Sequence, residues 1–107
     1  SNSFLEGNKK RTVKIIEMLK AEGTQPPLVL WALSKEVNNL YTVIEEGSTN
    51  GIWGPRYYLD LLSKRSKSLS SSKIKNSLKD IAEIDAAIKG LSDKSPWQSI
   101  RDLALNF

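Results

Sequence analysis

Side chains that could perform catalysis are sparse in this chain. Its 107 residues include no histidine and no cysteine, which removes the usual general base, the commonest metal ligand and all thiol chemistry. Serine is plentiful, but no serine has the histidine base that activates a nucleophilic hydroxyl. Glu45 and Glu46 are adjacent, so on a helix they diverge by about 100° and cannot easily share a site. We therefore expect no catalytic residue, no metal and no cofactor in this chain.

Attraction for anions is the other chemistry that the residue types suggest. No glycine-rich phosphate-binding motif occurs, but residues 56–79 carry seven basic side chains against Asp60 alone, a net charge of +6. This basic segment could meet nucleic acid or an acidic protein surface. The plainer interpretation is a solvated helix surface with a serine-rich turn.

The composition is that of one globular domain. Hydrophobic residues make up 39% of the chain and charged residues 26%, which is ordinary for a soluble protein. No apolar run approaches the roughly 20 residues that cross a bilayer, and the polar, then basic opening residues lead us to expect no signal peptide. The absence of cysteine fits a reducing compartment, so we expect a cytoplasmic location without a membrane partner.

Apolar spacing predicts five helices and no strand. The longest is a spine helix within residues 24–47, which begins at the Pro26-Pro27 pair and ends at Gly47. Its apolar positions step by three and four and extend around much of its circumference, which indicates a central helix. The other four helices are expected near residues 8–21, 55–68, 72–89 and 95–107. The fold class is therefore a single all-α, five-helix bundle.

Three stretches, in this order, carry a family resemblance: EGTQPPLVLWALSKEV, IWGPR and EIDAAIKGLSDKSPW. They resemble segments of the C-terminal domain of the bacterial DNA polymerase III delta-subunit family, and the opening FLEGNKKRTVKIIEML is similar to that family's lead into its first helix. No single motif is highly specific, but their order makes coincidence an unsatisfactory explanation. We interpret residues 1–3 as a cloning scar and residues 4–107 as a domain of a longer subunit.

The resemblance implies a role in DNA replication. This family is a non-hydrolysing component of the polymerase holoenzyme, and it belongs to the clamp loader, which opens the sliding clamp and places it on primed DNA. The last domain of the subunit is a helical bundle in a circular collar shared with the gamma/tau and delta prime subunits. By this resemblance the chain is a collar-type domain, and the residues that bind the clamp lie in N-terminal domains outside it.

A collar surface should be built on aromatic or arginine contacts with a polar rim. The candidates are Trp53, Arg56, Tyr57 and Tyr58, although an aromatic residue in a loop, such as Trp53, normally packs back onto the core. Trp31 and Trp97 are expected in the core, and Asp85 and Lys89 are expected to form a structural ion pair. Candidates for lying near DNA, by nonspecific phosphate attraction, are Lys64, Arg65, Lys67, Lys73 and Lys75.

Two other functions remain open on the sequence alone. The basic segment would suit an independent helical nucleic-acid-binding module. A generic helical adaptor from another system would have the same composition and helical periodicity.

Overall fold

The spine helix is present as α3, Pro26–Glu46, in the computed structural model, which describes residues 2–107. Pro26 opens the helix where the first turn does not need its missing N–H group. Gly47 ends it with φ of 74°, a left-handed conformation in which a side chain would be strained, and its N–H donates to the carbonyl of Val43. The sequence prediction for this helix is confirmed at both ends.

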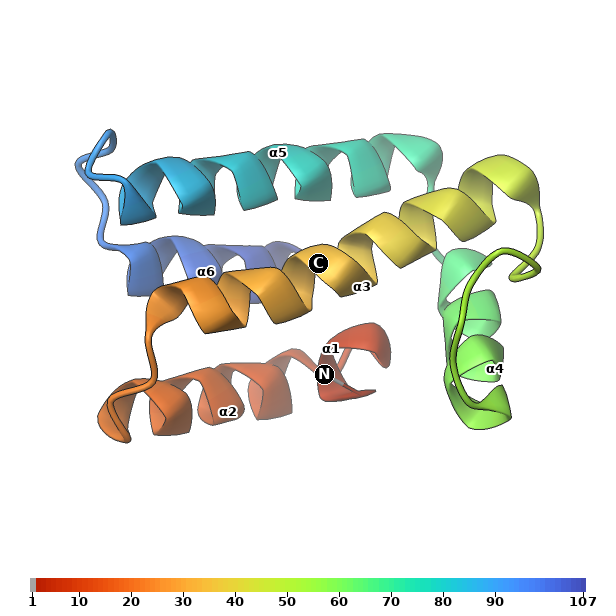
Figure 1. The fold of residues 1–107 in the computed structure, drawn as a ribbon, viewed down its shortest axis with the longest axis horizontal. Coiled ribbons are helices and arrows are strands. Elements are labelled where there is room, and N and C mark those ends of the chain that lie inside the picture. Colours follow the sequence, from red (N-terminus) through yellow and green to blue (C-terminus); the bar gives the residue numbers. More distant parts are fainter. Residues whose placement is uncertain (1) are drawn as a thin grey trace.

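Three helices pack directly on α3: α4 (Arg56–Ser66), α5 (Ser71–Ile88) and α6 (Pro96–Asn106). In Figure 1, α5 runs along one side of α3 and α4 stands across its C-terminal end. The expected central position of α3 is therefore confirmed, because other helices pack on several of its sides.

The remaining helices are α1 (Asn2–Leu5) and α2 (Lys9–Ala21). α2 packs on α6, and its contact with α3 is slight although a short turn joins the two helices. α1 lies against α2 and α4, and its Phe4 and Leu5 are buried in the core.

The described residues thus form six helices and no strand, so the all-α class is correct and the expected number of five is wrong. The additional helix is α1. It spans one turn, which is too short for a 3.6-residue pattern to be detectable in sequence.

Side-chain caps fix the start of three helices. Asn8, Ser70 and Ser95 each accept a hydrogen bond from the backbone N–H three residues later, at 3.0–3.1 Å. Each bond satisfies one of the donors that a first helical turn leaves unpaired. Because this chemistry is local, the predicted helix starts lie close to the observed ones.

The core is contiguous. Every helix except α2 contributes at least one large side chain that is almost completely buried. Its most deeply buried large side chains are Leu5, Val37, Leu40, Leu62, Ile74, Ile84, Ile100 and Leu103. α2 contributes Ile16, which is 4% exposed, and the partly buried Val13 and Leu19 pack beside it.

Candidate interaction surface

The corner between α3 and α4 presents two large aromatic side chains to solvent. Trp53 is 91% exposed and Tyr57 is 66% exposed. The expectation that Trp53 packs back onto the core is wrong, because its neighbour Ile52 takes that position in the loop. Large apolar area left in water on a rigid corner is typical of a protein contact site.

Arg56 opens α4 beside these rings. Its Nε lies 3.3 Å from Oδ1 of Asp60, one turn along the helix, and both side chains are largely exposed. Such an exposed pair contributes little to stability. Arg56 can therefore exchange Asp60 for an acidic or aromatic group of a partner at small cost.

Tyr58, the fourth candidate, is bound into the framework beneath this corner. Its hydroxyl donates to Oε1 of Glu36 at 2.6 Å and accepts from Nδ2 of Asn39 at 2.8 Å. Burial, and then the hydrogen bond to Glu36, raise the pKa of Tyr58 to about 12. A Cβ at Gly54 would lie 2.8 Å from the Tyr58 ring, so the loop can approach α4 only with glycine there. These contacts hold the corner at a fixed angle to α3.

The basic segment is divided between two helices. Lys64 and Lys67 lie at the C-terminal end of α4, whereas Lys73 and Lys75 lie in the first turns of α5. Two residues two apart on a helix point in different directions, so Lys73 and Lys75 do not share a face. The role of these lysines near DNA stays a prediction.

Arg65 differs from the lysines because its partly buried guanidinium contacts another part of the chain. Nη2 donates to the main-chain oxygen of Phe107 at 2.7 Å, and the guanidinium carbon lies 5.0 Å from the centre of the Phe107 ring. Partial burial lowers the pKa of Arg65. These contacts stabilise the fold, and a role of Arg65 near DNA stays a prediction.

The structural candidates have different outcomes. The Asp85–Lys89 pair is confirmed, with Lys89 Nζ 2.7 Å from Asp85 Oδ2. Trp97 packs against the core and remains partly exposed. The expectation that Trp31 lies in the core is wrong, because it is 71% exposed. The α3 side chains that lie towards α2 are Leu28, Val29, Ala32 and Leu33, so Trp31 lies on another side of the helix.

No cluster of three or more histidine, cysteine, aspartate or glutamate side chains within residues 2–107 could hold a metal ion. None of the helices in that range has the length and apolar character to span a bilayer. No protein-family model, no curated protein and no solved structure matches this chain.

Sequence reasoning missed a second surface, an open apolar groove between α2 and α3 that Leu28 and Ile15 border. The signal was present, since the apolar face of α3 is wider than one packing contact needs. The sequence did not indicate how α2 is oriented relative to α3.

Proposed function

We propose that this chain is a collar domain of a delta-type clamp-loader subunit, which holds its subunit beside the gamma/tau and delta prime subunits. The proposal comes from the three ordered motifs. The all-α architecture is compatible with it. In this proposal the domain performs no catalysis itself and transmits no nucleotide chemistry directly. It supplies a rigid lateral contact for a replication machine that opens the sliding clamp and loads it on primed DNA.

The observation that carries the binding part of the proposal is the pair of exposed rings, Trp53 and Tyr57, on a braced corner. A tryptophan that is 91% exposed offers a large apolar area to a partner and loses little side-chain entropy on binding. The Tyr58–Glu36–Asn39 hydrogen bonds beneath it fix the corner before a partner arrives. Preorganisation of this kind lowers the free-energy cost of association.

The motifs occupy two ends of the molecule. The first and third lie where α3 begins, α5 ends and α6 begins, and IWGPR lies at the α3–α4 corner on the opposite end (Figure 1). A ring of domains needs contacts on two sides of each member. Two separated ends therefore suit a member of a collar better than a protein with one binding site.

Co-elution tests the proposal. The chain, mixed at micromolar concentration with the gamma/tau and delta prime subunits, should elute with them in size-exclusion chromatography. Trp53→Ala and Tyr57→Ala should weaken the complex by at least about tenfold, as for an interface residue that contributes much of the binding energy. Leu105→Ala is the matched control, because Leu105 is also an exposed apolar residue, at 47%, and lies on α6 outside the three motifs.

Two results would count against the proposal in different ways. Failure of the wild-type chain to co-elute would remove the clamp-loader assignment. Co-elution that Trp53→Ala and Tyr57→Ala leave unchanged would keep the assignment and move the contact away from the α3–α4 corner.

A further inference from the structure

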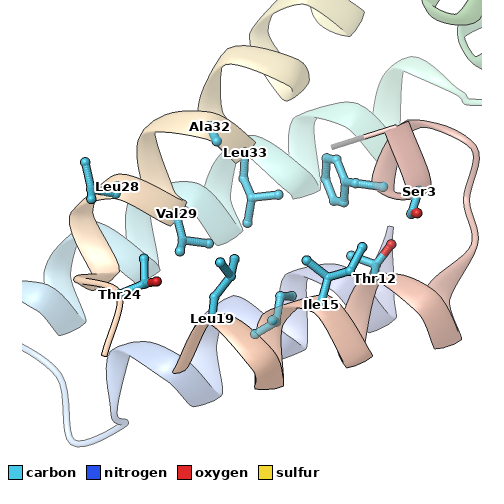
Figure 2. A pocket seen from close by; sticks show the side chains of 11 residues that line it. Ser3, Thr12, Ile15, Leu19, Thr24, Leu28, Val29, Ala32 and Leu33 are labelled. Carbon is cyan, nitrogen blue, oxygen red and sulfur yellow. The ribbon is translucent and has the colours of Figure 1, made fainter. Parts of the chain in front are cut away.

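The outer side of α2 carries a shallow depression with a volume of about 560 Å³. α2 lies along one edge of the molecule (Figure 1) and packs on α1 and α6. Of the residues that line the depression, we call Lys10, Arg11, Lys14, Ile15 and Met18 the outer face of α2. All five side chains are exposed. Ile15 also lines the groove between α2 and α3 (Figure 2) and is the residue that the two hollows share.

The outer face contains two apolar side chains that the fold does not cover. Ile15 is 39% exposed and Met18 is 53% exposed, and residues three apart are neighbours on a helix surface. The adjacent Ile16 is 4% exposed and belongs to the core, so α2 already packs with its other side. A methionine side chain is flexible and adapts to the surface of a partner. Ile15 and Met18 therefore offer a small apolar contact outside the core.

Positive charge gathers on the same face. Lys10 and Arg11 lie in the first turn of α2 and Lys14 lies in the second, and the first turn contains no acidic residue. The N-terminal end of a helix is the positive end of its dipole, so cations there lower the stability of the helix. None of the three forms an ion pair within residues 2–107. The fold of the chain alone gives these cations no stabilising role.

The carboxylates nearest in sequence do not neutralise this face. Glu17 bonds to Arg101 of α6, with Oε1 and Nη2 2.8 Å apart. Glu6 lines a different hollow beside the end of α4, and Glu22 caps the C-terminal end of α2, away from the three cations. An occupant of the depression should therefore supply its own negative charge.

We propose that the outer face of α2 binds an acidic segment of a protein partner that also carries an apolar side chain. The carboxylates of this segment lie against the three cations, which select it by charge complementarity. Its apolar side chain packs on Ile15 and Met18, where the aliphatic stems of the lysines help to exclude water. The face from Lys10 to Met18 is about 12 Å long at 1.5 Å per residue, so a short segment covers it.

The combination of charge and apolar surface favours this occupant over three others. Nucleic-acid phosphates would satisfy the cations but would leave Ile15 and Met18 without an apolar partner. A bilayer needs a broad apolar face, whereas this face exposes two apolar side chains among three cations. In a second copy of the chain, the hollow beside Glu83 and Asp93 has a suitable charge. The described residues that line that hollow, however, include no apolar side chain larger than Ala86. The proposal does not depend on the clamp-loader assignment, because it uses a surface distant in sequence from the α3–α4 corner.

Selection from a phage-displayed library of random short peptides tests the proposal. The library is first depleted on the α2 triple variant, Lys10→Gln, Arg11→Gln, Lys14→Gln, which removes peptides that bind other surfaces. It is then selected on the wild-type chain, and the recovered peptides should combine acidic residues with at least one large apolar residue. The most enriched peptide, synthesised and labelled, should bind in fluorescence anisotropy with an affinity that falls as salt rises, because the cations are exposed.

Matched variants locate the binding. The α2 triple variant should weaken the peptide by at least about tenfold. The variant Lys64→Gln, Lys67→Gln, Lys73→Gln removes the same charge elsewhere and should weaken it by less than about twofold. Met18→Gln should weaken it by at least about fivefold, whereas Leu91→Gln, at a leucine that is 78% exposed, should leave it unchanged. Equal weakening by the two triple variants would show attraction by net charge alone and would overturn the proposal.

Thermal unfolding separates binding from a structural role of the cations. The α2 triple variant should unfold at the same temperature as the wild-type chain or higher, because glutamine removes charges that oppose the helix dipole and has a similar helix propensity. A clearly lower unfolding temperature would show that the cations stabilise the fold, and the charge argument would fail.

Four binding results would also overturn the proposal. The first is that no peptide is enriched after depletion, and the second is that the enriched peptides are acidic but lack a large apolar residue. The third is that the chain binds vesicles of phosphatidylcholine and phosphatidylserine and Met18→Gln abolishes that binding, which would assign the face to a membrane. The fourth is that the chain dimerises in analytical ultracentrifugation and the α2 triple variant does not, which would assign the face to a second copy.

Discussion

Arg65 connects three separate parts of the chain by a single side chain. It extends from the last turn of α4 to Phe107, whose ring stacks on Phe4 of α1 with 4.2 Å between ring centres. A guanidinium can make this contact because it is planar, donates several hydrogen bonds and lies favourably over an aromatic face. Lys64, its neighbour in sequence, is exposed, so the two adjacent cations have different roles.

Arg65→Gln should therefore destabilise the fold by about 2 kcal/mol, because it removes a charge-assisted hydrogen bond and a cation–π contact. Urea unfolding followed by circular dichroism measures the difference. Lys64→Gln is the control and should change stability by less than about 0.5 kcal/mol, as for an ordinary surface position. Equal effects of the two substitutions would show that the Phe107 contact contributes nothing to stability.

Tyr58 is the second residue whose hydrogen bonds determine its role. Tyr58→Phe removes the hydroxyl that donates to Glu36, a carboxylate only 2% exposed. We expect a loss of about 1.5–3 kcal/mol, which is typical for a hydrogen bond to a charged group. Tyr57→Phe is the matched control, because Tyr57 is largely exposed, and should be nearly neutral. Thermal or urea unfolding at neutral pH distinguishes the two.

The same hydroxyl gives an alkaline pH dependence with a definite sign. Folding raises the pKa of Tyr58 from 10.0 to about 12, so the folded state retains a proton that the unfolded state releases first. The contribution is complete below pH 10 and is lost as pH rises towards 12. Tyr58→Phe should lack this part of the alkaline decline, and a decline identical to that of wild type would contradict the assignment.

At the scale of elements, the helices could be predicted closely and their arrangement could not. Pro26, Gly47 and Ser95 mark helix ends by chemistry that acts within one turn, so sequence is sufficient for them. Whether Trp31 is buried depends instead on which sides of α3 the other helices cover. That packing is decided by contacts between residues that are distant in sequence, and the apolar periodicity of one helix does not predict it.

The α3–α4 corner shows the same limit at the candidate site. Sequence identified Trp53 and Tyr57 as contact candidates from residue type alone. It could not separate them from Tyr58, because the partners Glu36 and Asn39 lie on another helix, 22 and 19 residues away. The groove between α2 and α3 was not predictable for a related reason, since it results from two helices that separate after a short turn.

A pair of substitutions on α3 tests this account of the element. Leu33 is 5% exposed and Trp31 is 71% exposed, although both belong to the apolar pattern. Leu33→Ala should cost about 2–5 kcal/mol, since it opens a cavity in the core. Trp31→Ala should change the free energy of unfolding by less than about 0.5 kcal/mol. Comparable losses in urea unfolding would place Trp31 in the core after all.

At the scale of the whole molecule, positive charge is dispersed over an elongated body of 37 × 25 × 22 Å. The chain has a net charge of +4, and its lysines lie on α2 and α3, at the end of α4, along α5 and in the loop after α5. Charges that are spread over several helices attract polyanions without a specific site. Such attraction is steeply salt-dependent and indifferent to which lysine supplies it.

The prediction for DNA follows from this dispersion. A fluorescent primed oligonucleotide should bind weakly at low salt and lose its anisotropy signal at moderate salt, since each phosphate contact contributes roughly −0.7 to −0.9 to the slope of log K against log salt. Lys64→Gln with Lys67→Gln, Lys73→Gln with Lys75→Gln, and the distant α2 pair Lys9→Gln with Lys20→Gln should each weaken binding to a similar extent. All three pairs remove two positive charges, so they differ only in position.

The comparison among these pairs decides between charge and site. If only the Lys73 and Lys75 pair abolished binding, the start of α5 would hold a defined phosphate contact. The nucleic-acid-binding function would then gain a specific observation in its favour. If the three pairs weaken DNA binding to the same extent, the lysines of the basic segment contribute no more than lysines elsewhere. Binding to proteins through the exposed aromatic corner then explains more of this surface than binding to DNA does.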